Sequence, residues 1–171
     1  MSVKAEQAYD VLIVGGGVTG CASACFLASD STFDGKIAVV ERDPTYEFSP
    51  SAKATGGFRQ QFSTPENIRM GLFGAHFVKN VGDYLSVEDE VPDVGFREEG
   101  YLLLASADSL PIMSANNALQ RENGAETEML TPQALAQRFP WLNVNGLAGG
   151  CTGGRNEGWL DPYALLQAYR K

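Results

Sequence analysis

A short apolar run followed by a glycine-rich turn lies near the start of the sequence and limits the folds open to it. Val11–Val14 has the length and continuous apolar character of a parallel strand that is covered on both faces. Gly15, Gly17 and Gly20 then follow the G-x-G-x-x-G spacing, and small, helix-compatible residues continue to Ala28. This order predicts a strand, a tight turn and a helix whose start is suited to a phosphate-bearing ligand.

Each glycine has a separate role in such a turn. Gly15 permits the tight turn, Gly17 lets a pyrophosphate approach the backbone, and Gly20 lets the helix lie close to the strand. The free N–H groups and the positive dipole end of the helix favour a bound anion. The candidate cofactor-binding residues of this turn are Gly15, Gly16, Gly17, Val18, Thr19 and Gly20.

A second apolar run ends in an acidic residue. Ile37–Val40 predicts the second strand, and Glu41 lies 21 residues after Gly20. A carboxylate there can accept hydrogen bonds from both ribose hydroxyls of an adenosine, and it repels a 2′-phosphate. The alternative is a glycine turn with no ligand, which leaves the order of strand, helix, strand and acid unexplained. We therefore predict an ADP-binding βαβ unit.

Composition argues against nucleic-acid and membrane partners. The 171 residues are 44% hydrophobic and 20% charged, and the net charge of −8 disfavours nucleic acid or an anionic membrane. No apolar run approaches membrane-spanning length, and the few residues before Val11 leave no room for a signal peptide. We expect a soluble, cytoplasmic protein.

Cysteine and histidine are too few to predict a metal site. Cys21 and Cys25 share a helix face, but no further cysteine or histidine lies near them in the sequence. We expect Cys21, Cys25 and Cys151 to be small buried thiols, and the single histidine, His76, to be a packing or surface residue.

The connection over residues 41–64 is rich in Ser, Pro, Gly and Thr. A loop of this length in a compact domain is usually functional or disordered. Its glycines allow close backbone approach and its polar residues supply planar donors, which favours contact with the phosphates or ring edge of a cofactor. A solvated loop whose arginine points into water is the alternative. The candidate residues here are Thr55, Gly56, Gly57, Arg59 and Gln60.

The rest of the chain predicts an α+β segment instead of further βαβ repeats. A helix capped by Thr64 is predicted to run to about residue 86, and residues 94–106 predict two short strands that meet at Glu99–Gly100. Further helices are expected over 109–122, from Thr131, and after an N-cap at Asp161, with an extended stretch over 146–154. The α/β dinucleotide-binding fold is thus begun and unfinished. We expect residues 1–63 to form the βαβ unit and its loop, 64–159 an inserted segment, and 160–171 a helix that leads back to the missing remainder.

With these residues in view, the chain resembles the amino-terminal portion of the D-amino-acid oxidase and sarcosine oxidase superfamily of FAD-dependent oxidoreductases. The likeness is strongest to the branch of the sarcosine oxidase beta subunit and dimethylglycine dehydrogenase, and to the related mitochondrial FAD-dependent oxidoreductase-domain proteins. The runs Gly57–Phe62 and Gly158–Pro162 are the selective ones, whereas Asp10–Ala28 is shared by many FAD and NAD proteins. The other matching stretches are Val39–Asp43, Thr55–Ile68, Glu99–Leu102 and Glu157–Tyr163.

The resemblance implies the amino-terminal part of a Rossmann-like FAD-binding domain of the glutathione-reductase type, with an inserted start of a substrate domain. It implies FAD, with the pyrophosphate over the glycine turn, the ribose on Glu41 beside Arg42, and the loop from Ser51 to Gln61 along the flavin. Arg59 would then lie near the flavin ring or the substrate. The implied chemistry is hydride transfer from the carbon next to an amine nitrogen to the flavin, followed by hydrolysis of the imine.

The resemblance leaves parts of the site open. It identifies no catalytic residue in this chain. Some dehydrogenases of this branch attach the flavin to a histidine just before the loop glycine, and Lys53 stands at that position here. We therefore predict no covalent histidyl linkage from this loop.

Three functional hypotheses follow. The first is an FAD-dependent oxidoreductase for an amine or an N-methyl or D-amino acid, of which this chain is a truncated or split portion that is inactive alone. Its partners would be a small-molecule substrate and the missing carboxyl-terminal portion or a companion chain. The second is a non-catalytic fragment that acts as an assembly or interaction module. The third is an NAD-binding domain, because Glu41 suits either adenosine, although the Arg59 loop and Gly158–Pro162 favour FAD.

Overall fold

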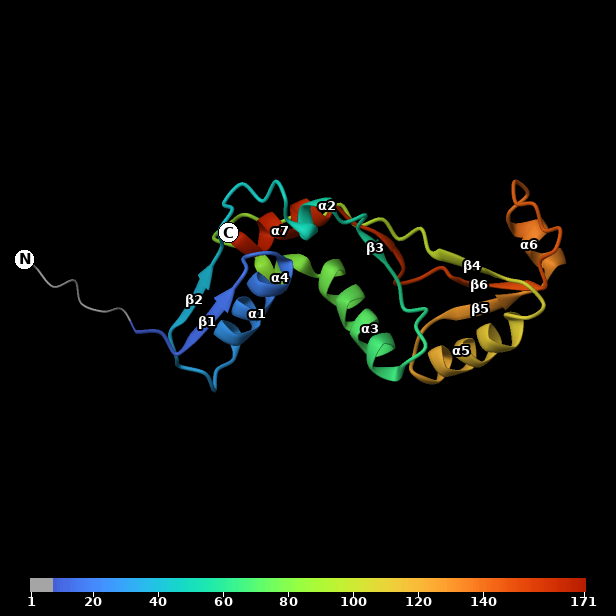
Figure 1. Ribbon diagram of the computed structural model, residues 1–171, viewed down its shortest axis with the longest axis horizontal. Helices are drawn as coiled ribbons and strands as arrows, with labels where there is room; N and C mark the ends of the chain where they lie inside the picture. The colour runs from blue at the N-terminus through green and yellow to red at the C-terminus, as the bar shows by residue number, and fades with distance from the viewer. Residues whose placement is uncertain (1–7) are drawn as a thin grey trace, which may run out of the picture. The chain divides into compact units, whose positions relative to one another are not determined.

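The two predicted parallel strands form in register at the start of the chain. In a computed structural model that describes residues 8–171, β1 (Val11–Val14) and β2 (Ile37–Val40) pair in parallel (Figure 1). The connecting helix α1 (Val18–Ser29) packs against both strands. The side chain of Ile13 lies on the face that α1 covers, because it is a near neighbour of Gly20 in that helix. The predicted βαβ unit is confirmed.

The opposite face of this sheet is open within the described residues, so the expectation of a strand covered on both faces is wrong. Leu12 is 60% exposed and Val14 is 82% exposed. Val14 pairs with Val40, which is also exposed. Successive strand residues point to opposite faces, and α1 covers only one of them. The first two strands therefore present an apolar surface to solvent.

The described residues form two compact units. The first comprises residues 8–55, 85–94 and 161–171, and the second comprises 56–84 and 95–160. We predicted a division of the chain into three parts, with boundaries after residues 63 and 159. This division stays a prediction, since a compact unit is not by itself a domain.

Helix α7 (Pro162–Arg170) completes the first unit. It packs against α1 and against the short helix α2 (Pro50–Lys53), and its Leu166 is fully buried. Asp161 caps it as predicted, because its Oδ1 accepts the N–H groups of Tyr163 at 2.8 Å and Ala164 at 3.0 Å. Two N–H groups of the helix that have no partner inside the helix are thereby satisfied.

Replacing Asp161 by alanine is expected to lower the free energy of unfolding by about 1 kcal/mol, because these two capping bonds are lost. Thr64→Ala is the matched control, since Thr64 holds the N-cap position of α3 (Pro65–Lys79) as predicted, but its side chain makes no capping bond. Urea unfolding of both variants measures the difference. Equal losses would contradict the assigned role of the Asp161 carboxylate.

The second unit is built on a three-stranded antiparallel sheet. Its strand order is β4 (Tyr101–Ala105), β6 (Gly149–Gly153), β5 (Thr127–Leu130), and α5 (Leu110–Glu122) and α6 (Pro132–Arg138) pack on β5 and β6 (Figure 1). A second, two-stranded pairing joins β3 (Gly57–Phe58) to β7 (Gly158–Trp159). The predicted helix over 65–86 is divided at Asn80 into α3 and α4 (Val81–Leu85).

The predicted hairpin at Glu99–Gly100 is wrong. β4 pairs with β6, and Arg97 forms an isolated bridge with Trp159. Gly100 has a φ of +79°, and its N–H donates to the carbonyl of Glu157 at 2.9 Å. The glycine thus brings the chain against a distant segment, a pairing that neighbouring residues do not encode.

Candidate functional site

A cleft of about 810 Å³ lies in the first unit, where β1 turns into α1. The glycine turn forms one wall, and the chain that follows β2 forms the other. The predicted site residues that line it are Gly15, Gly17, Thr19, Gly20, Glu41, Arg42 and Ser51. The fold therefore brings seven candidates, chosen from distant parts of the sequence, into one cleft.

The glycine turn has the shape that its spacing predicts. Gly15 has a φ of +104°, a conformation that side-chain-bearing residues rarely adopt. A Cβ atom on Gly20 would lie 1.9 Å from the carbonyl oxygen of Gly15, so only glycine lets α1 start this close to the strand. Gly17 is the N-cap of α1 and exposes its backbone beside Ser51. The turn is therefore an open backbone cradle at a helix N-terminus, which suits a diphosphate.

The carboxylate of Glu41 is bound to this cradle. Its Oε2 accepts the N–H of Gly16 at 2.8 Å, and its Oε1 accepts the N–H of Asp43 at 2.9 Å. The Asp43 N–H, and after it the Gly16 N–H, hold the pKa of Glu41 below its ordinary value, so the group is ionised at neutral pH. Each carboxylate oxygen retains a further lone pair that can accept a ribose hydroxyl.

Ser51 joins the loop after β2 to the start of α1. Its Oγ accepts the N–H of Val18 at 3.1 Å, and its own N–H donates to Ser49 Oγ at 3.2 Å. A hydroxyl can accept one hydrogen bond and donate another, so Ser51 can keep Val18 and still donate to a phosphate oxygen.

Sequence reasoning missed the cleft wall formed by the residues directly after Arg42. Tyr46 is only 6% exposed, and its hydroxyl lies so close to Gly16 that a Cβ there would be 2.7 Å from it. The guanidinium of Arg170 lies 4.4 Å from the centre of the Tyr46 ring. The length of the 41–64 connection was the available signal, since this wall has no periodic pattern. Its residues are Asp43, Thr45, Tyr46, Glu47, Phe48, Ser49 and Pro50.

The later candidates of the same loop are placed differently. Thr55 belongs to the first unit but does not line the cleft, and Gly56, Gly57, Arg59 and Gln60 belong to the second unit. The Gln60 side chain is 1% exposed, and its amide donates to the Asn156 carbonyl. Arg59 is exposed, with its guanidinium 5.1 Å from the centre of the Phe62 ring. Cofactor contact by these loop residues stays a prediction.

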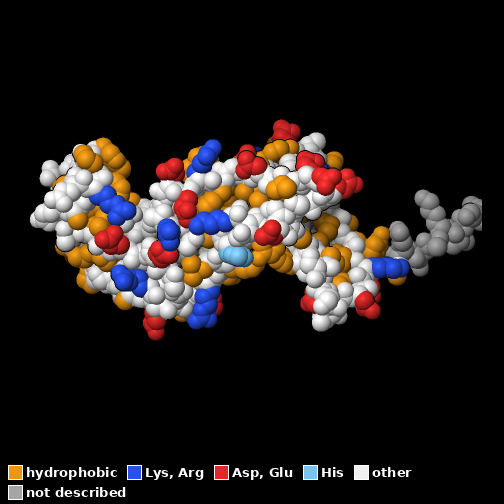
Figure 2. Space-filling model, turned by 180° about the vertical axis from the view of Figure 1, so that it is seen from behind, with side chains coloured by type: hydrophobic (Ala, Val, Ile, Leu, Met, Phe, Trp, Pro, Cys, Tyr) orange, Lys and Arg blue, Asp and Glu red, His pale blue; other side chains and the backbone are white. Residues whose placement is uncertain are grey.

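The described residues contain no cluster of three or more His, Cys, Asp and Glu side chains able to hold a metal ion. Cys151 is buried as expected, whereas Cys21 and Cys25 are only half-buried beside a second cleft of about 460 Å³. No helix in the described part of the chain is long and apolar enough to cross a membrane. Figure 2 shows acidic side chains close to the Lys and Arg side chains on the viewed face.

Comparison with known proteins matches nearly the whole chain. The family model for FAD-dependent oxidoreductases (DAO) matches residues 10–171. An FAD-dependent oxidoreductase domain-containing protein 1 from Xenopus laevis is 47% identical over 166 residues, which is 95% of this chain and 33% of the relative. The chain spans about a third of the length of the curated relatives it matches.

Solved structures share the fold. L-proline dehydrogenase from P. horikoshii matches with a TM-score of 0.76 and 21% identity, over 95% of this chain and 41% of that one. Glycine oxidase from Geobacillus kaustophilus matches with a TM-score of 0.73 and 24% identity, over 94% of this chain and 43% of that one. At these identities the likeness concerns the fold alone.

Proposed function

We propose that the first unit of this chain, which belongs to the family of FAD-dependent oxidoreductases, binds the ADP half of FAD. The chain would then form part of an enzyme that oxidises the C–N bond of a small amine or amino acid. The observation that carries the proposal is the Glu41 carboxylate, held by the N–H of Gly16 at the edge of the glycine cradle. The cradle fits a diphosphate and the carboxylate fits a ribose.

The residues of the chain would bind and orient the cofactor. The N-terminus of α1 would hold the diphosphate, Ser51 would donate to it, and Glu41 would accept the ribose hydroxyls. When bound, the flavin supplies the redox chemistry by accepting a hydride from the substrate carbon next to nitrogen. An ionised Glu41 would also repel the 2′-phosphate of NADP.

Arg59 is the residue that we assign to the substrate side. Its guanidinium lies over the rings of Phe62 and Tyr101, at 5.1 and 6.0 Å, and forms no ion pair within residues 8–171. A guanidinium supported by rings keeps its N–H groups available for a carboxylate. The names of the two structural neighbours, a proline dehydrogenase and a glycine oxidase, support an amino-acid substrate class.

An FAD titration of the purified chain, followed by flavin fluorescence, tests the cofactor site. Glu41→Gln is expected to weaken FAD binding roughly tenfold, because a hydrogen-bonded charge at the ribose is lost. Asp34→Asn removes an exposed carboxylate of the same unit outside the cleft and should leave the affinity unchanged. Equal FAD affinity in the wild type and Glu41→Gln, or preferential binding of NAD, would contradict the proposal.

The proposal includes a further polypeptide and a reducing compartment. We expect the remaining length of such a protein, or a companion chain, to cover the apolar face that Leu12 and Val14 expose. The three free cysteines suit a reducing compartment such as the cytoplasm.

An assembly or interaction module is the second candidate function, and the same exposed face favours it. A purified chain that binds a partner through this face but never binds flavin, with or without that partner, would support the module over the enzyme.

A further inference from the structure

We propose that Glu157 is a positioning residue that holds Arg59 in the orientation needed to meet the substrate. This inference rests on the proposed function for the role of Arg59, but the contact between the two segments is a property of the second unit by itself. Sequence reasoning assigned no role to Glu157, although it begins the matching stretch Glu157–Tyr163.

Glu157 is completely buried and accepts a hydrogen bond from the backbone next to Arg59. Its Oε1 accepts the N–H of Gln60 at 2.8 Å, and that N–H belongs to the peptide bond between Arg59 and Gln60. Its Oε2 accepts the side-chain N–H of Gln61, also at 2.8 Å. The carboxylate therefore holds the two residues that follow Arg59 through two separate donors.

The other side of Arg59 is held by the same stretch of chain. Gly57 and Phe58 in β3 pair with the residues of β7, which directly follow Glu157. The chain is thus hydrogen-bonded on both sides of Arg59, and the Arg59 side chain itself is exposed.

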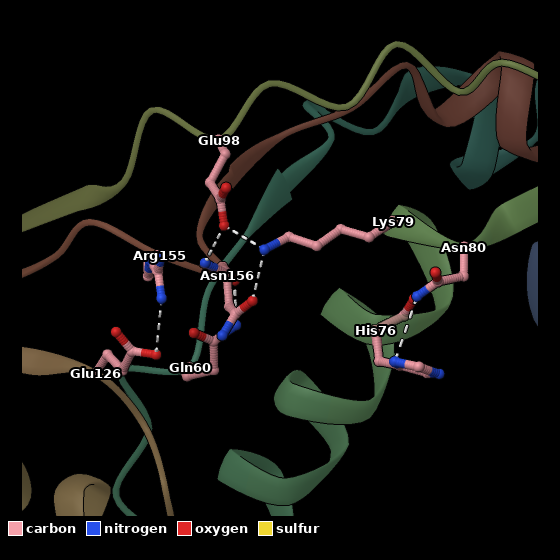
Figure 3. Close-up of polar contacts among 8 residues, drawn as sticks. All are labelled: Gln60, His76, Lys79, Asn80, Glu98, Glu126, Arg155 and Asn156. Carbon is pink, nitrogen blue, oxygen red and sulfur yellow. Dashed lines mark hydrogen bonds and ion pairs between the residues drawn. The ribbon is translucent and has the colours of Figure 1, made fainter.

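The residue before Glu157, Asn156, is also held by hydrogen bonds. Asn156 has a φ of +59°, and Figure 3 shows it hydrogen-bonded to both Lys79 and Glu98. Lys79 Nζ donates to Asn156 Oδ1 at 2.7 Å, and the Asn156 N–H donates to Glu98 Oε1 at 2.6 Å. The side-chain amide of Gln60 donates to the Asn156 carbonyl. Helix α3 therefore supports, through Lys79, the segment that carries the buried carboxylate.

Gln61 links Glu157 to Tyr101, whose ring lies under the Arg59 guanidinium. Its side-chain N–H lies 3.3 Å from the Tyr101 carbonyl as well as 2.8 Å from Glu157 Oε2. Tyr101 is one of the two rings that support the guanidinium. Glu157 thus orders both the backbone of Arg59 and one of the surfaces on which its side chain rests.

A carboxyl group is needed here, although burying its charged form costs free energy. Burial raises the pKa of Glu157, and no ion pair to it exists within residues 8–171. A buried charge without a cation is expensive, and a glutamine of equal size would avoid that cost. A glutamine, however, offers one oxygen and would turn its NH₂ toward one of the two donors. Only a carboxyl group presents an oxygen to both the Gln60 N–H and the Gln61 side-chain N–H as they are placed here.

NMR of the whole chain tests the contact through the Nε–Hε signal of Arg59, assigned by its absence in Arg59→Lys. The rings of Phe62 and Tyr101 should shift this signal away from those of other exposed arginines in the wild type. Glu157→Gln is expected to reduce that shift by at least half. Glu128→Gln, which removes an exposed carboxylate paired with Arg138, should leave it unchanged.

A second variant keeps the proposal testable if Glu157→Gln does not fold. Gln61→Met removes the amide but keeps the volume, and it should also reduce the Arg59 shift. An unchanged Arg59 signal in a folded Glu157→Gln, or in Gln61→Met if Glu157→Gln does not fold, would overturn the positioning role. The FAD titration is independent of this result: its failure would overturn the proposed function and leave the coupling of Arg59 to Glu157 standing.

Discussion

Gly20→Ala is expected to lower the free energy of unfolding by about 1–3 kcal/mol and to weaken FAD binding at least tenfold. The new Cβ would lie 1.9 Å from the Gly15 carbonyl oxygen and 3.2 Å from Ile13 Cγ2. Backbone atoms cannot rotate aside, so α1 must move away from β1, and the turn that would hold the diphosphate moves with it. Urea unfolding measures the loss of stability, and flavin fluorescence measures the affinity.

Gly17→Ala is the matched control for this effect, because the two glycines lie in the same turn. Gly17 has a φ of −68°, and a Cβ there would meet two side-chain hydroxyls, Ser51 Oγ at 3.2 Å and Ser49 Oγ at 3.9 Å, and no backbone atom within 4 Å. We expect its stability to stay within about 0.5 kcal/mol of the wild type. Its FAD affinity should still fall, because the methyl group stands where the diphosphate would approach. An equal loss of stability in both variants would contradict the close-packing role of Gly20.

The buried carboxyl of Glu157 is expected to make the protein less stable as the pH rises. Burial, the larger influence, raises its pKa above the ordinary 4.5, although the N–H groups of Gln60 and Gln61 oppose this. The folded state therefore binds this proton more tightly than the unfolded state does. The stabilisation is fully present below pH 4.5 and is lost as the pH rises through the raised pKa. A tenfold difference in proton affinity between the two states corresponds to about 1.4 kcal/mol.

Urea unfolding at pH 4 and pH 7, with Glu157→Gln alongside the wild type, measures this loss. Glutamine does not titrate, so the wild type should lose stability relative to the variant as the pH rises. Glu98→Gln should show the opposite sign, because Lys79, and after it the Asn156 N–H, lower the pKa of Glu98. Its contribution is present at neutral pH and is lost as the pH falls through the lowered pKa. The same sign in both variants would contradict the assigned environment of Glu157.

The βαβ unit was predictable because its determinants are local. The apolar runs that form β1 and β2, the glycine spacing after the first and the acid after the second all act within a few residues of their positions. Asp161 was predictable for the same reason, since a cap bonds to residues two and three positions ahead. The family resemblance, which rests most selectively on Gly57–Phe62 and Gly158–Pro162, agrees with the family that matches residues 10–171.

The sequence by itself thus determined the glycine turn, the acid bonded to it and the family of the chain. Only the tertiary structure decided that β4 pairs with β6 instead of with its neighbour, and that Tyr46 lies against Gly16. It alone brought Glu157 to the Gln60 N–H, which lies 97 positions away in the sequence and directly follows Arg59. The physical reason is that short-range patterns set the conformation of each segment, whereas the partner of a strand edge or a buried carboxylate depends on which distant segments pack together.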